Sequence, residues 1–294
     1  MNGGPLRGRT AVVTGAARGI GAALARDLSG RGMRVALLGH EGERLRDLAD
    51  ALPGPALACE VDVTDDAALA RAAEAVRAAL GTPSVVVANA AVADGGLFAD
   101  SDPARWRRII DVNLTGSAAT ARTFLPDLTA TKGYHLQIAS LAAIGAAPMM
   151  SAYCASKAGV EAFAHSLRAE VAHQGVAVGL GYLTWIGTDL IHDADRHTVM
   201  RELRGHMPWP VRNVYPVDRA AARLASGVER RRTAVYFPRW LRLGQPLRPA
   251  MPSVVTRATR YYLPRLQSRE PLPPTDLLGG GGRADAKATT RPPT

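Results

Sequence analysis

A strand, a glycine-rich turn and a helix near the start of the chain restrict its fold more than any other feature. The apolar run Thr10–Thr14 is followed at once by Gly-Ala-Ala-Arg-Gly-Ile-Gly at positions 15–21, and a helical pattern continues to Gly30. Glycine allows a tight turn and a close approach of the backbone to a ligand, and a helix N-terminus attracts negative charge. This stretch therefore predicts a site for the pyrophosphate of a dinucleotide.

The alternation of strand and helix continues along the chain. Strands are expected at residues 10–14, 34–38, 56–61, 84–88, 134–139, 176–182 and 233–237. Helices are expected at residues 15–30, 41–52, 65–80, 103–131, 151–173 and 217–231. Repeated βαβ units build a parallel sheet whose crossover helices cover both faces. The sequence thus predicts an α/β fold, a doubly wound parallel sheet in one domain at residues 1–238.

Composition and charge narrow the class of protein. With 294 residues, 47% of them hydrophobic, the chain can form one large core. We expect a cytoplasmic protein, because the first nine residues are polar and no apolar run is long enough to span a membrane. There are 17 basic and 20 acidic residues up to Asp195, but 19 basic and 6 acidic residues after it. Nucleic-acid binding is disfavoured, because this basic excess lies outside any recognisable binding element.

A tyrosine and a lysine mark a second site. Tyr153 and Lys157 are four residues apart in an expected helix, so they share one helix face, and Ser140 follows the preceding strand. A phenol has an ordinary pKa of about 10. A neighbouring ammonium favours the phenolate, so we expect Lys157 to lower the pKa of Tyr153. The pair alone arises by chance in many helices, and its context gives it weight.

Taken together, these residues resemble the short-chain dehydrogenase/reductase family. The resemblance runs from Arg9 to Tyr236 and rests on Thr14-Gly15-Ala16-Ala17-Arg18-Gly19-Ile20-Gly21, Asp62-Val63, Ala88-Asn89-Ala90-Ala91, Asn113, Ser140, Tyr153-x-x-x-Lys157 and Thr188. It implies a Rossmann-like fold and nicotinamide-dependent oxidoreduction of a carbonyl or an alcohol. It also implies homodimers or homotetramers built through two long helices.

The resemblance implies a role for each matched residue. Tyr153 would be the general acid that protonates the carbonyl oxygen, and Lys157 would lower its pKa and hold the ribose hydroxyls. Ser140 would polarise the carbonyl, and Asn113 would fix a water in the proton relay. No metal is implied. The implied cofactor-binding residues are Gly15, Arg18, Gly19, Ile20, Gly21, His40, Asp62, Val63, Asn89, Tyr153, Lys157, Ile186 and Thr188.

The end of the second strand bears on the choice of cofactor. NAD enzymes of this type place a carboxylate there, but this chain has Gly39, followed by His40 and Glu41. Arg18 in the glycine turn could instead meet a 2′-phosphate, with help from His40. We therefore favour NADP and keep NAD as the alternative, because Glu41 would repel a phosphate if it turned inward.

The segment at residues 184–215 is expected to be a long substrate loop with short helical pieces. The family's usual Pro-Gly pair is replaced by Leu183-Thr184, and Ala91 stands where glycine is usual, so we expect an altered loop shape with the chemistry retained. Apolar residues suit a hydrophobic ketone or alcohol, or simply pack the loop. The candidate pocket residues are Ala142, Ile144, Met149, Met150, Trp185, Leu190, Met200, Met207 and Trp209.

Two further segments follow the domain. Residues 239–276 form a basic extension punctuated by prolines, in which residues 253–263 fit a short amphipathic helix. Such a helix suits peripheral contact with an anionic membrane, and it could equally cover the substrate pocket or pad an oligomer interface. Residues 277–294 begin with a glycine run and are expected to be disordered.

A different class of function is also open. Some relatives of this fold bind a cofactor as regulators or scaffolds without turnover, and such proteins usually lose the tyrosine or the lysine. This chain keeps both Tyr153 and Lys157, so we favour an enzyme.

Overall fold

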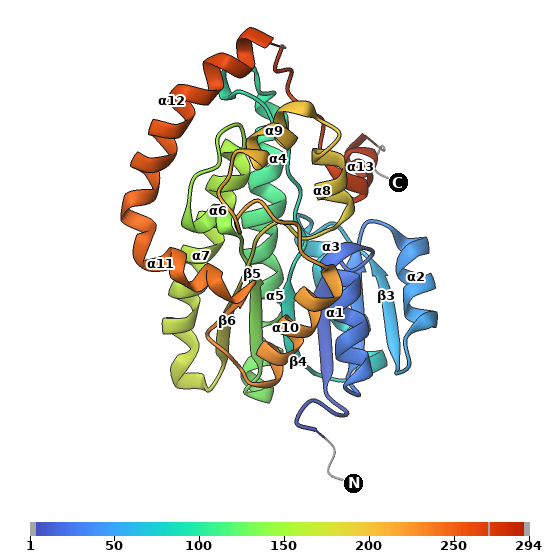
Figure 1. Ribbon diagram of the computed structural model, residues 1–294. Helices are drawn as coiled ribbons and strands as arrows, with labels where there is room; N and C mark the ends of the chain where they lie inside the picture. The colour runs from blue at the N-terminus through green and yellow to red at the C-terminus, as the bar shows by residue number, and fades with distance from the viewer. Residues whose placement is uncertain (1–3, 270, 291–294) are drawn as a thin grey trace.

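Seven parallel strands form the centre of the computed structural model, which describes residues 4–269 and 271–290 (Figure 1). The strands lie in the order β3-β2-β1-β4-β5-β6-β7. They are β1 (Thr10–Thr14), β2 (Arg34–Gly39), β3 (Ala56–Glu60), β4 (Pro83–Ala88), β5 (Tyr134–Ile138), β6 (Ala177–Leu183) and β7 (Ala234–Phe237). The order reverses between β1 and β4, and ligands of such sheets bind beyond the carboxyl ends of the strands at this point.

Helices bury both faces of the sheet, as the near-continuous apolar strands require. One core contains side chains of α1 (Gly19–Gly30), α2 (Gly42–Ala51) and α10 (Val217–Glu229). The other contains side chains of α3 (Asp66–Leu80), α5 (Gly116–Thr131) and α7 (Ser151–Val171). The predicted doubly wound fold is therefore confirmed.

The long helix expected at residues 103–131 is divided. It consists of α4 (Pro103–Ile110), a π-helical turn η2 (Asp111–Thr115) and α5. The Asn113 side chain in this turn bonds to the backbone of Val92, outside the helix. Turns of this kind are often found at functional sites, and an apolar periodicity does not reveal them because they change the register by a single residue.

Short helices follow β5 and β6 at the carboxyl edge of the sheet, at the top of Figure 1. They are α6 (Leu141–Ile144), α8 (Asp189–Ala194) and α9 (Thr198–Gly205), and the last two lie in the expected substrate loop. No described helix is long and apolar enough to cross a membrane.

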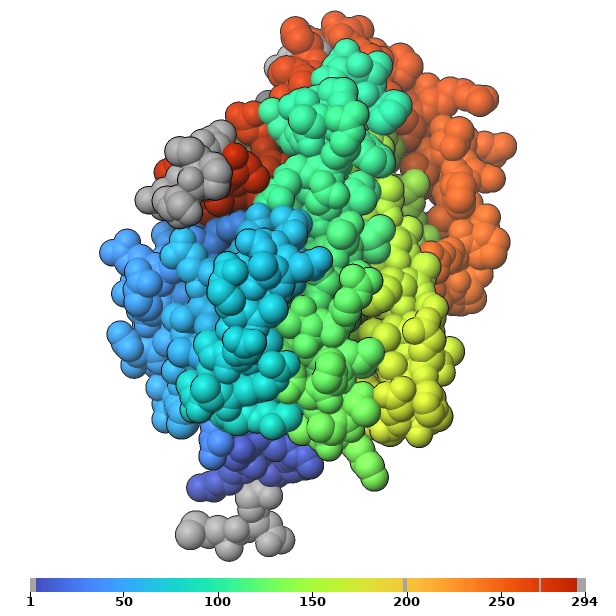
Figure 2. Space-filling view, turned by 180° about the vertical axis from the view of Figure 1, so that it is seen from behind, coloured from blue at the N-terminus to red at the C-terminus, as the bar shows by residue number. Residues whose placement is uncertain are grey.

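The chain after β7 is more regular than expected. It forms η4 (Arg239–Leu243), α11 (Gly244–Leu247), η5 (Arg248–Ala250) and α12 (Met251–Arg269). The helix expected at residues 253–263 is longer at both ends. Pro252 lies in its first turn, where proline costs no hydrogen bond, and the helix continues past the interior Pro264 to Arg269. In Figure 2, α12 in orange flanks the yellow-green helix α7.

The tail also differs from the expectation of disorder. Residues Gly279–Thr290 form α13, while residues 291–294 lie outside the described part of the chain. Leu278 N donates to Ala93 O at 2.8 Å and Thr275 N donates to Gly95 O at 2.6 Å. These bonds, together with the ion pairs of Arg283 and Asp285, offset the conformational entropy that a glycine-rich segment loses on ordering. The tail lies against the blue N-terminal half in Figure 2.

Candidate active site

A cavity of about 220 Å³ lies beyond the carboxyl ends of β1 and β4 and brings most of the predicted site residues together. The predicted residues that line it are Gly15, Arg18, Gly19, Ile20, His40, Val63, Asn89, Ser140, Tyr153, Lys157, Ile186 and Thr188. Gly21, Asp62 and Asn113 do not line this cavity. The tail contributes residues 278–282 together with Ala284 and Asp285 to the same cavity, which the sequence did not predict.

The glycine turn needs its glycines for steric reasons. Gly15 and Gly19 have φ values of +63° and +54°, a region that favours glycine. A Cβ on Gly21 would lie 2.2 Å from Gly15 O, so α1 can start this close to β1 only without a side chain there. Asn89 fixes the turn, because its Nδ2 donates to Thr14 O at 2.9 Å. The turn can thus present the N-terminus of α1 to a pyrophosphate, as predicted.

Tyr153 and Lys157 face the cavity from the first turns of α7. Lys157 Nζ donates to Ile138 O at 3.2 Å and lies 5.6 Å from the centre of the Tyr153 ring. The Ser140 hydroxyl forms a hydrogen bond with the Tyr153 phenol. The structure therefore brings the phenol of Tyr153, the hydroxyl of Ser140 and the amine of Lys157 together at one cavity.

The pKa values in this group differ from the expectation. Burial raises the pKa of Tyr153, and the hydrogen bond with Ser140 offsets only part of that rise. Burial also lowers the pKa of Lys157 to about 8. We expected Lys157 to lower the pKa of the phenol, but withdrawal of both groups from water has the larger effect, because it disfavours their charged forms.

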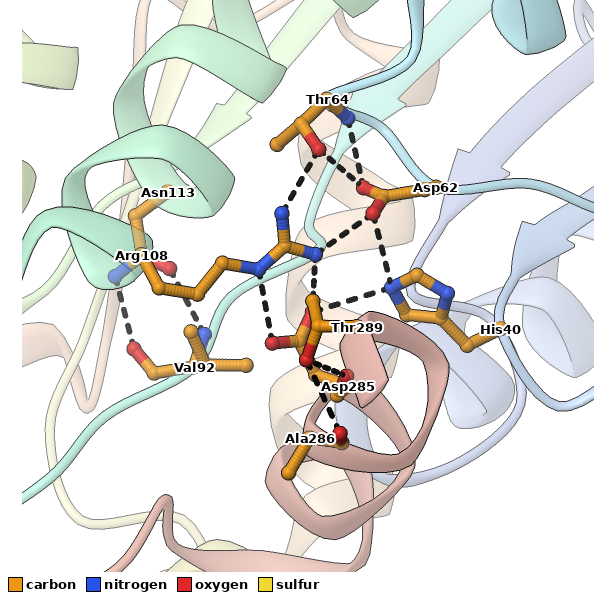
Figure 3. A network of polar contacts seen from close by, with 9 residues as sticks. All are labelled: His40, Asp62, Thr64, Val92, Arg108, Asn113, Asp285, Ala286 and Thr289. Atoms are coloured by element: carbon orange, nitrogen blue, oxygen red, sulfur yellow. Dashed lines mark hydrogen bonds and ion pairs between the residues drawn. The ribbon is translucent and has the colours of Figure 1, made fainter. Parts of the chain in front are cut away.

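Asn113 holds the wall of the cavity from behind. It is fully buried, and its Oδ1 accepts a hydrogen bond from Val92 N at 2.8 Å. Its Nδ2 donates to Val92 O and to Ser156 Oγ, both at 2.9 Å. One side chain thus joins η2, the loop after β4 and α7, and Figure 3 shows its pair of bonds to Val92.

Charged side chains gather around Arg18 and His40, the residues that the sequence assigned to a 2′-phosphate. Arg18 Nε donates to Glu41 Oε2 at 2.6 Å, and Arg18 Nη1 donates to Asp189 Oδ2 at 2.5 Å. His40 Nε2 lies 3.2 Å from Asp285 Oδ1. Both side chains that the sequence assigned to a 2′-phosphate therefore contact carboxylates of the chain itself.

Asp62 belongs to the same cluster through a residue that the sequence did not indicate. Its Oδ1 accepts from Thr64 N at 2.8 Å, and its Oδ2 accepts from Arg108 Nη2 at 2.7 Å (Figure 3). Burial alone would raise the pKa of Asp62, but the bonds from Thr64 and Arg108 lower it overall. Arg108 and Asp285 were missed because no local pattern links them to Asp62.

A family model for short chain dehydrogenases matches residues 9–198. The chain belongs to this family. A glycine betaine reductase of Emericella nidulans is 36% identical over 179 residues, which are 60% of this chain but only 14% of that relative. A cis-4-hydroxycyclohexanecarboxylate dehydrogenase of Sinomonas cyclohexanicum is 39% identical over 183 residues, which cover 59% of this chain and 73% of the relative.

Solved structures of family members have the same fold. A short-chain dehydrogenase/reductase from Burkholderia phymatum in complex with NAD has a TM-score of 0.73 at 24% identity, and the match covers 83% of this chain and 94% of the other. A metagenomic short-chain oxidoreductase in complex with NADP has a TM-score of 0.57 at 38% identity, with 60% and 82% covered. Both dinucleotides thus occur among the structural neighbours of this short-chain dehydrogenase.

A second cavity, of about 530 Å³, adjoins the first in this short-chain dehydrogenase and also reaches Ser140 and Tyr153. The predicted pocket residues that line it are Ala142, Met150, Trp185, Leu190, Met200 and Met207. Trp209 is instead 74% exposed, and Ile144 is buried in the core against the sheet. The α12 residues that complete its wall, which the sequence left open, are Met251, Val254, Val255, Ala258, Thr259 and Tyr262.

Proposed function

We propose that this oxidoreductase interconverts a carbonyl and a secondary alcohol on a hydrophobic small molecule, with Tyr153 as the general acid and base. The observation that carries the proposal is that Tyr153 and Ser140 line both cavities, the one beside the glycine turn and the more apolar one beneath α12. A carbonyl placed between the two cavities would reach both hydroxyl groups.

Each polar group has one task in this proposal. The bound nicotinamide supplies the hydride in reduction and accepts it in oxidation. In reduction, Tyr153 Oη gives its proton to the carbonyl oxygen, while the Ser140 hydroxyl donates a hydrogen bond to that oxygen. Lys157 stabilises the phenolate that forms, and Asn113 keeps the loop after β4 in place.

The high pKa of Tyr153 suits the acid role, because the phenol keeps its proton until it is transferred. In the direction of oxidation the phenolate must form first. The ammonium of Lys157 then favours the required charge, and it does so only below the pKa of about 8 that burial gives it.

Replacing Tyr153 with phenylalanine tests the proposal. We expect turnover to fall by about a hundred- to ten-thousand-fold, because the proton donor is lost. The Kd of NADPH, measured by fluorescence titration, should stay within a factor of about three, since the ring is kept. The matched control is Tyr261→Phe, a largely exposed tyrosine on α12, which should keep full activity. Equal turnover in wild type and Tyr153→Phe would contradict the proposal.

The same experiment separates the enzyme from its rival, a cofactor-binding regulator or scaffold that performs no turnover. A regulator would bind NADPH and show no turnover on any substrate, with or without the Tyr153 hydroxyl. The substrate panel should contain hydrophobic ketones and cyclic secondary alcohols, since a relative acts on a hydroxycyclohexane carboxylate and the second cavity is mostly apolar.

NADP is the proposed cofactor, with NAD as the alternative. The support is the absence of a carboxylate at Gly39 and the nearness of Arg18 and His40 to the cavity. Arg18 is paired with Glu41, so it contributes to phosphate binding only when that ion pair opens. We expect a higher kcat/KM for NADPH than for NADH on one substrate, and a clear advantage for NADH would overturn this choice.

Two partners complete the proposal. A homodimer or homotetramer would form through the long helices α5 and α7, and its size is measured by light scattering of the eluted protein.

The basic face of α12 would touch an anionic membrane, because Arg257, Arg260 and Tyr261 point away from the cavity that the other face of the helix covers. In this arrangement one face of α12 covers the substrate pocket while its opposite face contacts the lipid.

A further inference from the structure

The tail is fixed across the mouth of the cofactor cavity by polar contacts. Gly279 N donates to Asp193 Oδ2 at 2.9 Å, and Arg283 forms an ion pair with the same carboxylate. A Cβ on Gly280 would lie 1.7 Å from Arg18 Nη1, so the backbone of the tail lies directly on the arginine of the glycine turn. The tail therefore bridges the two walls of the cavity.

The Asp285 carboxylate is the deepest polar group of the tail. Arg108 Nε donates to its Oδ2 at 3.0 Å, and Arg108 Nη2 donates to its Oδ1 at 2.6 Å (Figure 3). His40 Nε2 lies 3.2 Å from the same Oδ1, and the residue is only 1% exposed. Burial by itself would raise the pKa of Asp285, but the bonds from His40 and Arg108 lower it overall, so the group is ionised at neutral pH.

This contact has the form of anion recognition. A guanidinium that donates two parallel hydrogen bonds matches a carboxylate and a phosphate equally well. We propose that His40 and Arg108 form the anion site for the 2′-phosphate of NADP, and that Asp285 fills this site until the cofactor displaces the tail. The inference rests on the proposed function, since it assumes that a dinucleotide occupies the first cavity.

Charge explains why the Asp285 carboxylate and the 2′-phosphate of the cofactor would exclude each other from this site. With the tail in place, two carboxylates, Asp62 and Asp285, lie beside Arg108 and His40. An incoming phosphate therefore meets negative charge, and Arg108 Nε and Nη2 already donate to these carboxylates. When Asp285 leaves, Arg108 keeps one carboxylate and regains two hydrogen-bond donors. The apparent Kd of the cofactor is then its intrinsic Kd divided by the fraction of molecules in which the tail is detached.

The first test is Asp285→Asn in the full-length protein. The amide keeps the shape but loses the charge-assisted bonds, so the tail should detach more often. If the tail is bound in nine molecules of ten, the Kd of NADPH falls by up to about tenfold, and that of NADH falls less because it has no 2′-phosphate. In wild type, NADPH should raise the hydrogen exchange of residues 279–290.

A second variant displaces the tail by another route. Gly279 has a φ of +77°, and a Cβ there would lie 2.8 Å from the backbone of Leu190, so Gly279→Ala should detach the tail while Asp285 is kept. It should also tighten NADPH binding. The matched control is Asp276→Asn, the same charge change on an exposed residue just before the tail, which should leave both Kd values unchanged.

The outcomes separate this inference from the proposed function. If neither dinucleotide binds wild type or either variant, the proposed function fails. If NADPH binds wild type and both variants equally, or Asp285→Asn weakens its binding, the tail does not compete and only this inference fails. Equal gains for NADH and NADPH would also overturn it, because the carboxylate would then not occupy the phosphate site.

Discussion

At the scale of single residues, burial shifts the pKa values of two basic side chains away from the values that they have in water. Lys157 and His135 both lose affinity for protons because the interior disfavours a cation. For Lys157 this occurs beside the proposed acid-base group. His135 is the second residue of β5 and only 1% exposed, and the proposed chemistry does not use it.

His135 should make the fold sensitive to acid. Burial lowers its pKa to about 4 from an ordinary 6.5, so between these values the unfolded chain binds a proton that the folded chain does not. The free energy of unfolding therefore falls as the pH falls through this window, by about 3 kcal/mol in all. Urea unfolding at pH 7 and pH 4.5 measures the change.

His135→Leu should lose this part of the acid sensitivity. The control His173→Leu, at an exposed histidine, should keep it. An equal fall in stability between pH 7 and pH 4.5 for wild type and His135→Leu would show that another group is responsible.

At the scale of elements, local patterns predict an element well when its own residues determine it. The glycine turn, the strands and the start of α7 carry their signals within a few residues, and the structure has them where the sequence predicted them. Helix α13 has no such signal, because four glycines and small residues disfavour a helix. Its order depends on contacts such as that of Asp285 with Arg108, 177 residues away in sequence.

Helix α12 should control the use of bulky substrates. Val255 lines the second cavity, and Val255→Ser removes apolar surface from its wall. We expect the KM of a large hydrophobic ketone to rise by about tenfold, while the KM of the cofactor stays the same. Steady-state kinetics on small and large ketones measure the effect.

The matched control for α12 is Thr256→Ala, at an exposed position of the same helix. An equal rise in KM for small and large ketones in Val255→Ser would point to a general distortion of the site and contradict a role for α12 in binding substrate.

At the scale of the whole molecule, the basic excess lies on the segments that follow the family match. Residues after Asp195 carry 19 basic and 6 acidic side chains, and the family model ends at residue 198. Composition predicted this asymmetry, but only the fold places α12 with one face on the substrate cavity and arginines on the other. A surface of this kind attracts anionic lipid at low ionic strength.

The double variant Arg257→Glu, Arg260→Glu should bind anionic vesicles less well than wild type. Each arginine near such a surface contributes about 1 kcal/mol, so reversing two charges should weaken binding by more than about tenfold. Co-sedimentation with phosphatidylserine vesicles measures it. The control reverses two exposed arginines elsewhere, Arg26 on α1 and Arg223 on α10. Equal sedimentation of both double variants with wild type would argue against membrane contact.

The two ends of the described chain lie at opposite edges of the sheet (Figure 1). β1 starts at the edge away from both cavities, whereas α13 ends beside the dinucleotide cavity. A purification tag or fluorescent protein fused on the N-terminal side of β1 is therefore remote from both cavities. The same protein fused on the C-terminal side of α13 lies beside the dinucleotide cavity. Laboratories that fuse this polypeptide at its two ends should obtain different nucleotide affinities from one and the same enzyme.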